Sequence, residues 1–560
     1  MPKIVIDDFR GGRNTNDAVN LVANNQHAVG NNVWVETRAL AKRRGFTVQS
    51  ISLNSLTPIP ENLYTSHLAS SSLLRLMIAG RVSAHSQKYL LYTDNGTSFS
   101  WAGYVTGTVS VTGATVTGSG TAWSTNVTAG DRFMVNAEAT FTEISTVDSD
   151  TQLTLTANYP ANYSAGSAYT VIQQITQGRP TSMASFDVSG AQNIFVVDGT
   201  RGYRYNGTTT VIVAAVPAFR YIIAFKNYLF GLGHNTTDVR WSALRDAATW
   251  NSNNFQQVGT VGNPTRGFAI YEDSLIIFTR RGMYRLVGDV FDPSNPTYVL
   301  QPISVPVNFN FTFPRTAVTH QGILKFLTAD GWFAYTGGDS IQKISLVVQA
   351  DVDGFRRLAF ASEAMQDSAV AFVHNDRMWC SVPDNDETPA DTLNTIYVQD
   401  ERGAWWKWDM SQQSAAGEVC DFALVQYTSG GTYSLAAGNV GTTSLTTLDT
   451  GSADNTAAIN GSWTSREFVF DDDVEFSEIR VTLATQSAGN LVVGFSIDRA
   501  TVVNTNAPMT GGVGTVSRRA IPVRRIGKAI RVTVSNNTAD QTFEVYKIEI
   551  FFNESDAQRA

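Results

Sequence analysis

The strongest constraint on the fold is a repeated unit, in which a run of strand-forming residues leads into a turn containing glycine and then into an aromatic-rich strand. Clear examples are "SLIIFTRRGMYRLVG" from Ser274 and "GILKFLTADGWFAYTGG" from Gly322. The later units begin 34, 47, 49, 54 and 56 residues apart, at Gln192, Lys226, Asp273, Gly322, Asp376 and Thr432. Blades of β-propellers recur at about 40–50 residues, with four strands each. The spacing therefore predicts a β-propeller.

The side-chain pattern inside the units agrees with this prediction. In "MYRLV" (283–287) the alternation places an aromatic or aliphatic side chain on one face of the strand at every second position. The glycine between the strands supplies the positive φ of a tight hairpin. We expect an all-β protein with a propeller of six to eight blades; the alternative is a large β-sandwich with irregular hairpins.

One interval does not fit the repeat. The units at Lys88 and Gln192 lie 104 residues apart, and this distance falls to 34 if residues 104–173 are an insertion. The segment is an alternation of Thr, Val and Gly with few charges, and "DSD" (148–150) between two alternating runs is typical of a hairpin turn. We predict a small β-barrel or sandwich carried on a blade loop, where insertions are tolerated.

The repeats stop near Gly451. Five strand-like segments follow within residues 452–560, and they predict a C-terminal β-sandwich of the jelly-roll type. The expected organisation is an N-terminal arm (1–60), a propeller (61–103 and 174–451), the inserted domain (104–173) and the sandwich (452–560). Short helices are predicted only at 24–33 and 352–365.

The N-terminal segment carries the most specific motif, "IDDFRGGRNTNDAVNLVANNQHAVGNNVWVETRALAKRRGF" (6–46). It resembles the opening of many bacteriophage tail proteins, and the inserted and C-terminal segments also resemble modules of such proteins. The resemblance points to the tail nozzle (tail hub or tubular) proteins of short-tailed phages. The matched positions are Asp8, Phe9, Gly11, Gly12, Asn14, Thr15, Asn25, Gln26, Asn32, Val33, Leu40, Lys42, Arg43 and Gly45.

The resemblance implies a structural virion protein that extends the tail tube below the portal and adaptor and conducts DNA during ejection. Its partners would be other copies in a ring of six, the tail adaptor, a tail fibre or spike protein, and passing double-stranded DNA that is not bound specifically. The chain would be made in the host cytoplasm and end in the phage tail. A formal net charge of −8, with only 16% charged residues, fits a wall that does not hold phosphates. No apolar stretch is long enough to span a membrane.

The residues predicted to contact partners belong to the motif and to the basic stretch "SRRAIPVRRIGK" (517–528). The glycines would bring the backbone close to a partner, and the basic side chains would pair with partner carboxylates. The alternatives are a solvated turn at "KRRG" and a solvated edge strand at 517–528. The candidates are Asp8, Phe9, Gly11, Gly12, Asn14, Lys42, Arg43, Arg44, Arg518 and Arg525.

Catalytic and metal-binding patterns are missing from the sequence. The six histidines lack zinc spacing, and no G-x-S-x-G, P-loop or C-x-x-C occurs. The run Asp471–Asp473 is interpreted as a turn rather than a Ca²⁺ loop, because the spaced ligands are missing. Cys380 and Cys420 are expected as free thiols in the core. We therefore expect no catalytic, cofactor or metal residues, and no enzyme.

Two functional alternatives stay open: a carbohydrate-active tail protein of the depolymerase or sialidase type, and a receptor-binding tail protein. "TDNGTSFSW" (93–101) partly resembles the aspartate box of propeller sialidases, but no pair of carboxylates is indicated. The aromatic run at Trp405, Trp406 and Trp408 is interpreted as blade core, with a sugar-stacking platform as the alternative.

Overall fold

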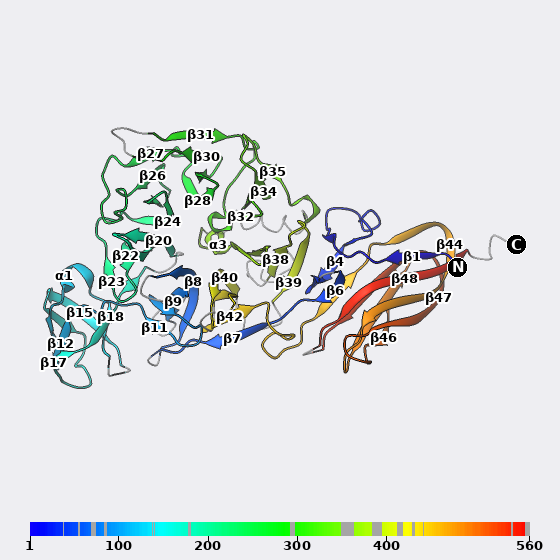
Figure 1. The fold of residues 1–560 in the computed structure, drawn as a ribbon, viewed down its shortest axis with the longest axis horizontal. Coiled ribbons are helices and arrows are strands. Elements are labelled where there is room, and N and C mark those ends of the chain that lie inside the picture. Colours follow the sequence, from blue (N-terminus) through cyan, green and yellow to red (C-terminus); the bar gives the residue numbers. More distant parts are fainter. Residues whose placement is uncertain are drawn as a thin grey trace.

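The chain forms a seven-bladed β-propeller joined to a large C-terminal sheet, with a small inserted domain at the opposite end (Figure 1). The computed structural model describes the chain except for residues 37, 54–55, 69–73, 83–86, 137, 139, 177–180, 234, 290, 292–296, 349–362, 383–394, 411–417, 428–431, 441, 539–540 and 555–560. The predicted all-β fold with a propeller of six to eight blades is confirmed.

Each blade is an antiparallel meander, and the first strands of the blades lie against one another around the axis. Blade 1 contains β8 (Pro58–His67), β9 (Leu74–Val82), β10 (Gln87–Thr93) and β11 (Ser100–Trp101), with β19 (Gln174–Ile175) beside β10. Blades 2 to 4 contain β20 (Ser182–Val188), β21 (Ala191–Val197), β22 (Gly202–Tyr205), β23 (Thr210–Ile212), β24 (Phe219–Phe225), β25 (Tyr228–Gly233), β26 (Asp238–Trp241), β27 (Phe255–Gln257), β28 (Thr265–Tyr271), β29 (Ser274–Thr279), β30 (Gly282–Val287) and β31 (Val299–Ile303).

Blades 5 and 6 contain β32 (Val318–His320), β33 (Ile323–Thr328), β34 (Gly331–Tyr335), β35 (Gln342–Lys343), β36 (Val370–His374), β37 (Arg377–Ser381), β38 (Thr395–Gln399) and β39 (Trp405–Asp409). Blade 7 contains β40 (Glu418–Val425), β41 (Ser434–Val440) and β42 (Ser444–Leu448), and its outer strand is β7 (Phe46–Ser50) from the N-terminal segment. Strand β7 pairs with β42 from Phe46 opposite Leu448 to Ser50 opposite Ser444. Two distant parts of the chain therefore close the ring.

The inserted domain forms a sheet of its own and a separate apolar core around Trp123, Phe133 and Tyr169. Tyr104 and Val171 exchange two backbone hydrogen bonds, of 2.8 and 2.9 Å, so the chain leaves and re-enters the propeller side by side. Its elements are β12 (Thr108–Thr112), β13 (Thr115–Ser119), α1 (Trp123–Asn126), β14 (Arg132–Val135), β15 (Thr142–Ser149), β16 (Gln152–Leu155), β17 (Tyr163–Ser167) and β18 (Tyr169–Ile172).

The C-terminal sheet has ten strands, and four of them come from the N-terminal segment. The sheet comprises β1 (Lys3–Ile6), β4 (Val29–Asn31), β5 (Val33–Glu36), β6 (Ala39–Lys42), β43 (Gly461–Thr464), β44 (Phe468–Ala484), β45 (Asn490–Ile497), β46 (Val503–Pro508), β47 (Val516–Asn536) and β48 (Glu544–Glu554). Strands β2 (Gly12–Arg13) and β3 (Gln26–His27) form a separate parallel pair. Residues 1–60 are thus divided among the sheet, the β2–β3 pair, blade 7 and the start of blade 1 instead of forming an arm.

The prediction of a helix at 24–33 is wrong, because this segment forms β3 and β4, and β4 pairs with β43 far along the chain. The second predicted helix, at 352–365, lies mostly outside the described residues. The other short helices within the described ranges are η2 (Pro314–Thr316), η3 (Leu346–Val348) and α3 (Glu363–Ser368). No helix in the described ranges is long and apolar enough to cross a membrane.

The propeller and the C-terminal sheet share one continuous hydrophobic core. Phe9 meets Trp463 edge-on with ring centroids 5.3 Å apart, and Trp34 meets Trp408 at 5.7 Å. At the centre of this joint, Arg43 donates to both carboxylate oxygens of Asp454, at 2.7 and 2.6 Å, and both side chains are almost fully buried. A buried bidentate pair of this kind fixes one arrangement of the segments that carry it.

Replacing Asp454 with Asn should lower the free energy of unfolding by about 3–5 kcal/mol, because removing one partner leaves a buried charge unpaired. Denaturant unfolding followed by tryptophan fluorescence measures the change. Asp8→Asn is the matched control, since it breaks an Asp–Arg pair whose side chains are 36% and 52% exposed and exposed pairs contribute little. Equal effects of the two substitutions would contradict the role given to the buried pair.

Replacing residues 106–169 with a short Gly/Ser linker should leave the propeller folded, because the two ends of the excised segment are adjacent strands held by the Tyr104–Val171 bonds. Thermal unfolding followed by circular dichroism should remain cooperative. Deletion of 228–241 in blade 3 is the control, and it should abolish cooperative unfolding. Loss of cooperativity in the first variant would show that the inserted domain is part of the propeller core.

Candidate functional site

The most distinctive polar depression lies where the N-terminal hairpin β5–β6 meets blades 6 and 7. Two adjoining cavities, of about 290 and 590 Å³, share Asn375 as a lining residue. We call them together the junction groove. Its polar and aromatic lining residues are Trp34, Glu36, Arg44, His374, Asn375, Asp376, Arg377, Asp400, Glu401, Arg402, Trp406, Tyr433 and Asp449. Cavities that bind small ligands have volumes of about 300–1,000 Å³.

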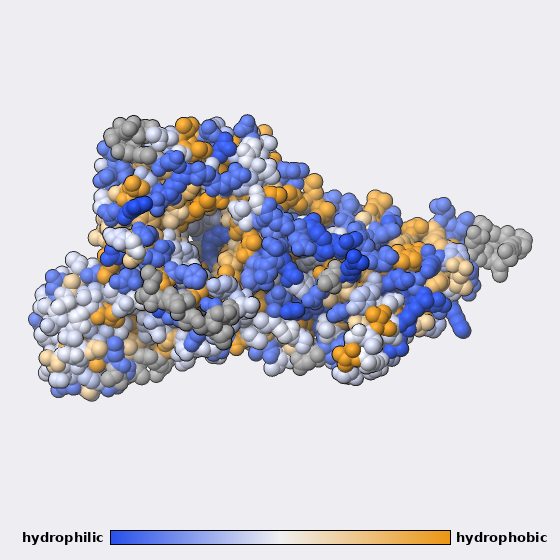
Figure 2. Space-filling model, in the orientation of Figure 1, coloured by the Kyte–Doolittle hydropathy of each residue, from blue (hydrophilic) through white to orange (hydrophobic). Residues whose placement is uncertain are grey.

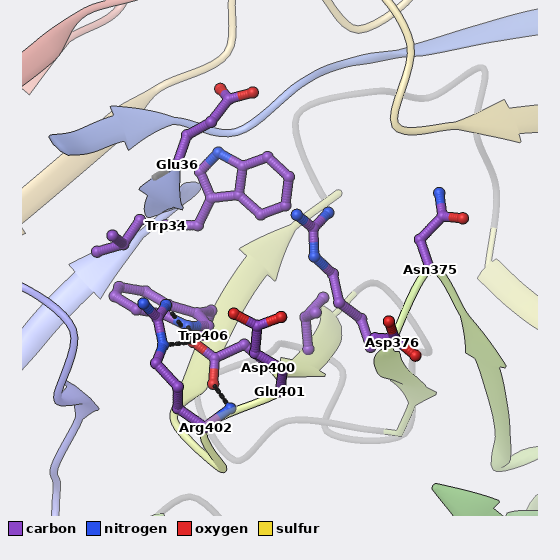
Figure 3. A pocket seen from close by; sticks show the side chains of 11 residues that line it. Trp34, Glu36, Asn375, Asp376, Asp400, Glu401, Arg402 and Trp406 are labelled. Atoms are coloured by element: carbon purple, nitrogen blue, oxygen red, sulfur yellow. Dashed lines mark hydrogen bonds and ion pairs between the residues drawn. The ribbon is translucent and has the colours of Figure 1, made fainter. Parts of the chain in front are cut away.

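Two tight turns of blade 6 form one side of the groove (Figure 3). Between β36 and β37, Asn375 and Asp376 both have positive φ, 51° and 54°, as a two-residue hairpin requires. Between β38 and β39, Asp400 accepts hydrogen bonds from the backbone of Arg402 and Ala404, at 2.9 and 3.0 Å. Asp400 thus fixes its turn, and the next residue, Glu401, is exposed at the tip.

Two tryptophans, Trp34 and Trp406, line the smaller cavity, but their side chains are buried. Trp34 and Trp406 are 4% and 1% exposed, and the Arg377 guanidinium lies 3.8 Å from the centre of the Trp34 ring. Trp405, Trp406 and Trp408 are all buried in the core, so the sugar-stacking alternative for this run is wrong. The exposed aromatic ring of the groove is Tyr433, which is 42% exposed and lines the larger cavity.

Asp449, which lines the larger cavity, has a raised pKa. Burial raises its pKa, Arg377 and Arg44 oppose the rise, and the nearby charge of Glu36 adds to it. Its Oδ2 atom lies 3.5 Å from Arg377, whereas Oδ1 is buried with no hydrogen-bond partner among the described residues. The result is a carboxyl group that holds its proton more firmly than usual.

The pKa values of two further groups in the groove, His374 and Arg377, are lowered by burial. Burial lowers the pKa of His374, and the positive charge of Arg377 acts in the same direction although Asp449 opposes both. Burial also lowers the pKa of Arg377 itself. His374 is therefore a neutral imidazole at neutral pH, and it can donate one hydrogen bond and accept another.

The propeller axis, seen as a depression in Figure 2, is also lined by charged groups, but they bind one another. The ion pairs on or beside the inner strands are Glu61 with Arg81 and Lys88, Asp367 with Arg220, and Asp421 with Arg315. Asp421 also accepts the backbone N–H groups of Leu63 and Phe422, at 2.8 and 2.9 Å. Glu61 binds within blade 1, whereas Asp367 and Asp421 link different blades, so these carboxylates are used by the fold and the axis offers a weaker catalytic arrangement than the junction groove.

The structure places most of the predicted partner-contact residues inside the joint. Phe9, Gly12, Asn14, Lys42 and Arg43 are buried, and they cannot reach another subunit without a rearrangement. Asn14 donates to Asp17 and Gln26, both at 2.8 Å, and Lys42 donates to Asn536 at 2.9 Å. The role predicted for these residues is corrected accordingly: within the chain they bind the N-terminal segment to the rest of the fold.

The other candidates are partly or fully exposed. Gly11 and Asp8 are half-buried, and Asp8 pairs with Arg10. Arg44 is exposed at the groove, 3.3 Å from Glu36. Arg518 and Arg525 are exposed on β47, where Arg518 contacts the buried carboxylate of Glu549. Of the ten predicted partner-contact residues, Arg44 is therefore the one that lines the junction groove.

Sequence reasoning missed Glu36, Tyr433 and Asp449. Glu36 lies in the N-terminal segment and the other two lie in blade 7, about 400 residues further along the chain, and no local spacing links them. The structure also places Asp471, Asp472 and Asp473 on the surface of β44, and no group of three or more metal-binding side chains occurs among the described residues. Cys380 and Cys420 are buried free thiols, as predicted.

No family model and no curated protein matches the chain. Similar solved structures include an exo-β-1,3-galactanase from Phanerochaete chrysosporium, at 11% identity and a TM-score of 0.25 over 76% of this chain and all of that one. The N-terminal domain of Nup159 has 10% identity and a TM-score of 0.33 over 75% and 98% of the two chains. A family 43 arabinoxylan arabinofuranohydrolase from Bacillus subtilis has 10% identity and a TM-score of 0.21 over 89% and 96%.

These matches correct one expectation. Several of the matched structures are glycoside hydrolases, which stands against the prediction that the chain is not an enzyme. TM-scores this low carry no statement on the fold, substrate or mechanism of this chain.

Proposed function

We propose that the junction groove binds a carbohydrate and cleaves a glycosidic bond. The observation that carries the proposal is the state of Asp449, a carboxyl group with an unpartnered Oδ1 atom and a raised pKa, to which the charge of Glu36 contributes. Glycosidases use such a pair, in which one carboxyl group keeps its proton and the other is ionised.

In this reaction Asp449 donates its proton to the oxygen of the glycosidic bond as that bond breaks. Glu36, which is 43% exposed at the side chain, either attacks the sugar carbon or removes a proton from the attacking water. The distance between the two carboxyl groups in the substrate complex decides between these routes. In both routes the leaving sugar gains one proton, and water supplies the hydroxyl of the other product.

The remaining groups of the groove suit a sugar ligand. The exposed ring of Tyr433 offers a face against which the C–H groups of a sugar ring can pack. Asn375, neutral His374 and Arg44 offer donors and acceptors for hydroxyl groups. Hydrophilic residues also cover the surface between the propeller depression and the C-terminal sheet (Figure 2).

Asp449→Asn should lower the rate of cleavage by about 10²–10⁴-fold, since general acid catalysis contributes this much. In the unsubstituted protein, the rate should fall as pH rises through the raised pKa of Asp449, because the proton to be donated is lost. Release of reducing ends from capsular polysaccharide, lipopolysaccharide and β-glucan measures both effects.

Asp8→Asn, far from the groove, is the control and should keep full activity. Glu36→Gln should reduce activity as Asp449→Asn does. Activity that survives both groove substitutions, or complete inactivity of the unsubstituted protein on all three substrates, would contradict the proposal.

The N-terminal segment favours a second candidate function, a subunit of the tail tube of a short-tailed phage. Its resemblance to tail nozzle proteins covers residues 6–46, and the same residues join the propeller to the C-terminal sheet. In this role the chain would stand in the virion as a ring of copies, contact the adaptor and a fibre or spike, and let DNA pass through the lumen. The net charge of −8 would limit binding of the passing phosphates.

The tail role predicts a closed ring of six copies with an open lumen. Native mass spectrometry gives the copy number of the purified chain, and class averages from electron microscopy show the lumen. A monomer at all concentrations, also after addition of the tail adaptor protein, would contradict the tail role without affecting the groove.

A further inference from the structure

Arg377 of blade 6 contacts side chains from both of the other segments that meet at the junction groove. Its guanidinium lies 3.8 Å from the centre of the Trp34 ring, which belongs to the hairpin β5–β6. Its Nη1 atom lies 3.5 Å from Oδ2 of Asp449, which directly follows β42 in blade 7. The side chains of Arg377 and Asp449 are only 26% and 16% exposed, so salt screens this pair less than it screens a surface pair.

The fold fixes the position of this guanidinium before any substrate binds. Arg377 lies directly opposite His374 where the hairpin β36–β37 closes, and side chains at opposite positions of a hairpin lie on the same face. The ring of His320 donates a hydrogen bond of 2.9 Å to the backbone carbonyl of Asp376 in the intervening turn. The buried ring of Trp34 then supports the flat guanidinium by stacking, a contact that a lysine ammonium makes less well.

Arg377 is also the main counter-charge of Asp449. Burial raises the pKa of Asp449, and four neighbouring groups act on it as well. Of these four, Arg377 has the largest effect and lowers the pKa. Arg44 and His374 act in the same direction, and Glu36 opposes them. Arg44 is 54% exposed and lies 3.3 Å from Glu36, so it is already occupied by another carboxylate.

We infer that Arg377 is the positioning residue of the junction groove: held on the Trp34 ring, it contacts Oδ2 of Asp449 and fixes both the place and the charge of this carboxyl group. The inference rests on the proposed cleavage reaction and names the residue that regulates its proton donor. Arg377 acts through Asp449 and takes no proton itself. Since Trp34 belongs to the hairpin β5–β6, the state of the proton donor depends on the N-terminal segment being seated at the propeller.

The test follows the titration of Asp449 directly. In protein labelled with ¹³C at the aspartate carboxyl groups, the Asp449 signal is identified by its loss in Asp449→Asn. Arg377→Gln should move the titration midpoint to higher pH by about 1 pH unit, because a neighbouring positive charge favours the ionised carboxylate. Arg377→Lys keeps the charge and should bring the midpoint back toward that of the unsubstituted protein. Arg402→Gln is the matched control: this arginine lines the same groove but pairs with Asp400 at 2.7 Å, so the midpoint should not move.

The pH dependence of cleavage is the second measurement. The pH at which the cleavage rate falls should rise in Arg377→Gln by the same amount as the midpoint of Asp449, since the proton to be donated is kept to higher pH. A residue that only stabilised the fold would lower the rate at every pH and leave the position of this fall unchanged.

Each outcome decides a different point. An unchanged midpoint of Asp449 in Arg377→Gln would overturn the inference and leave the cleavage function intact. Absence of cleavage by the unsubstituted protein would overturn the proposed function, and the midpoint would still decide whether Arg377 controls Asp449. If circular dichroism shows that Arg377→Gln does not fold, the unsubstituted protein decides: the Nε–H resonance of Arg377 should shift with the midpoint of Asp449, and a resonance that does not respond would overturn the inference.

Discussion

The buried pair of Arg43 and Asp454 is the interaction on which the arrangement of the whole chain depends. Directly after Arg43, Gly45 exchanges backbone hydrogen bonds with Thr450 and Gly451, of 3.0 and 3.2 Å, and the chain then enters blade 7 as β7. The same pair lies beside the sheet that β4, β5 and β6 share with the C-terminal strands. One desolvated ion pair therefore fixes both the closing strand of the propeller and the position of the second sheet.

The junction groove is a consequence of this closure. Glu36 and Arg44 flank the hairpin that the ion pair fixes, while Asp449 ends the strand that pairs with β7. Burial at this closure, together with the charge of Glu36, raises the pKa of Asp449 against the opposing charges of Arg377 and Arg44. The fold brings the hairpin β5–β6, blade 6 and blade 7 together at the groove. The groups with shifted pKa values, His374, Arg377 and Asp449, lie where these segments meet.

The N-terminal motif illustrates how a specific sequence pattern can serve the fold. Phe9 packs edge-on against Trp463, Asn14 binds Asp17 and Gln26, and Arg43 binds Asp454. A motif rich in Gly, Asn and Arg suggests an exposed contact surface when the sequence is considered alone. Its burial was not predictable, because the residues that cover it come from the far end of the chain.

The sequence by itself determined the strands, the seven repeated hairpins and the separate inserted domain, since alternation of side chains and turn residues act over a few neighbouring positions. Only the tertiary structure decided that β7 closes blade 7, that residues 24–33 form strands instead of a helix, and that the charge of Glu36 acts on Asp449. Each of these depends on pairing between segments separated by hundreds of residues. Local preference is weak at such positions, and long-range packing selects the final conformation.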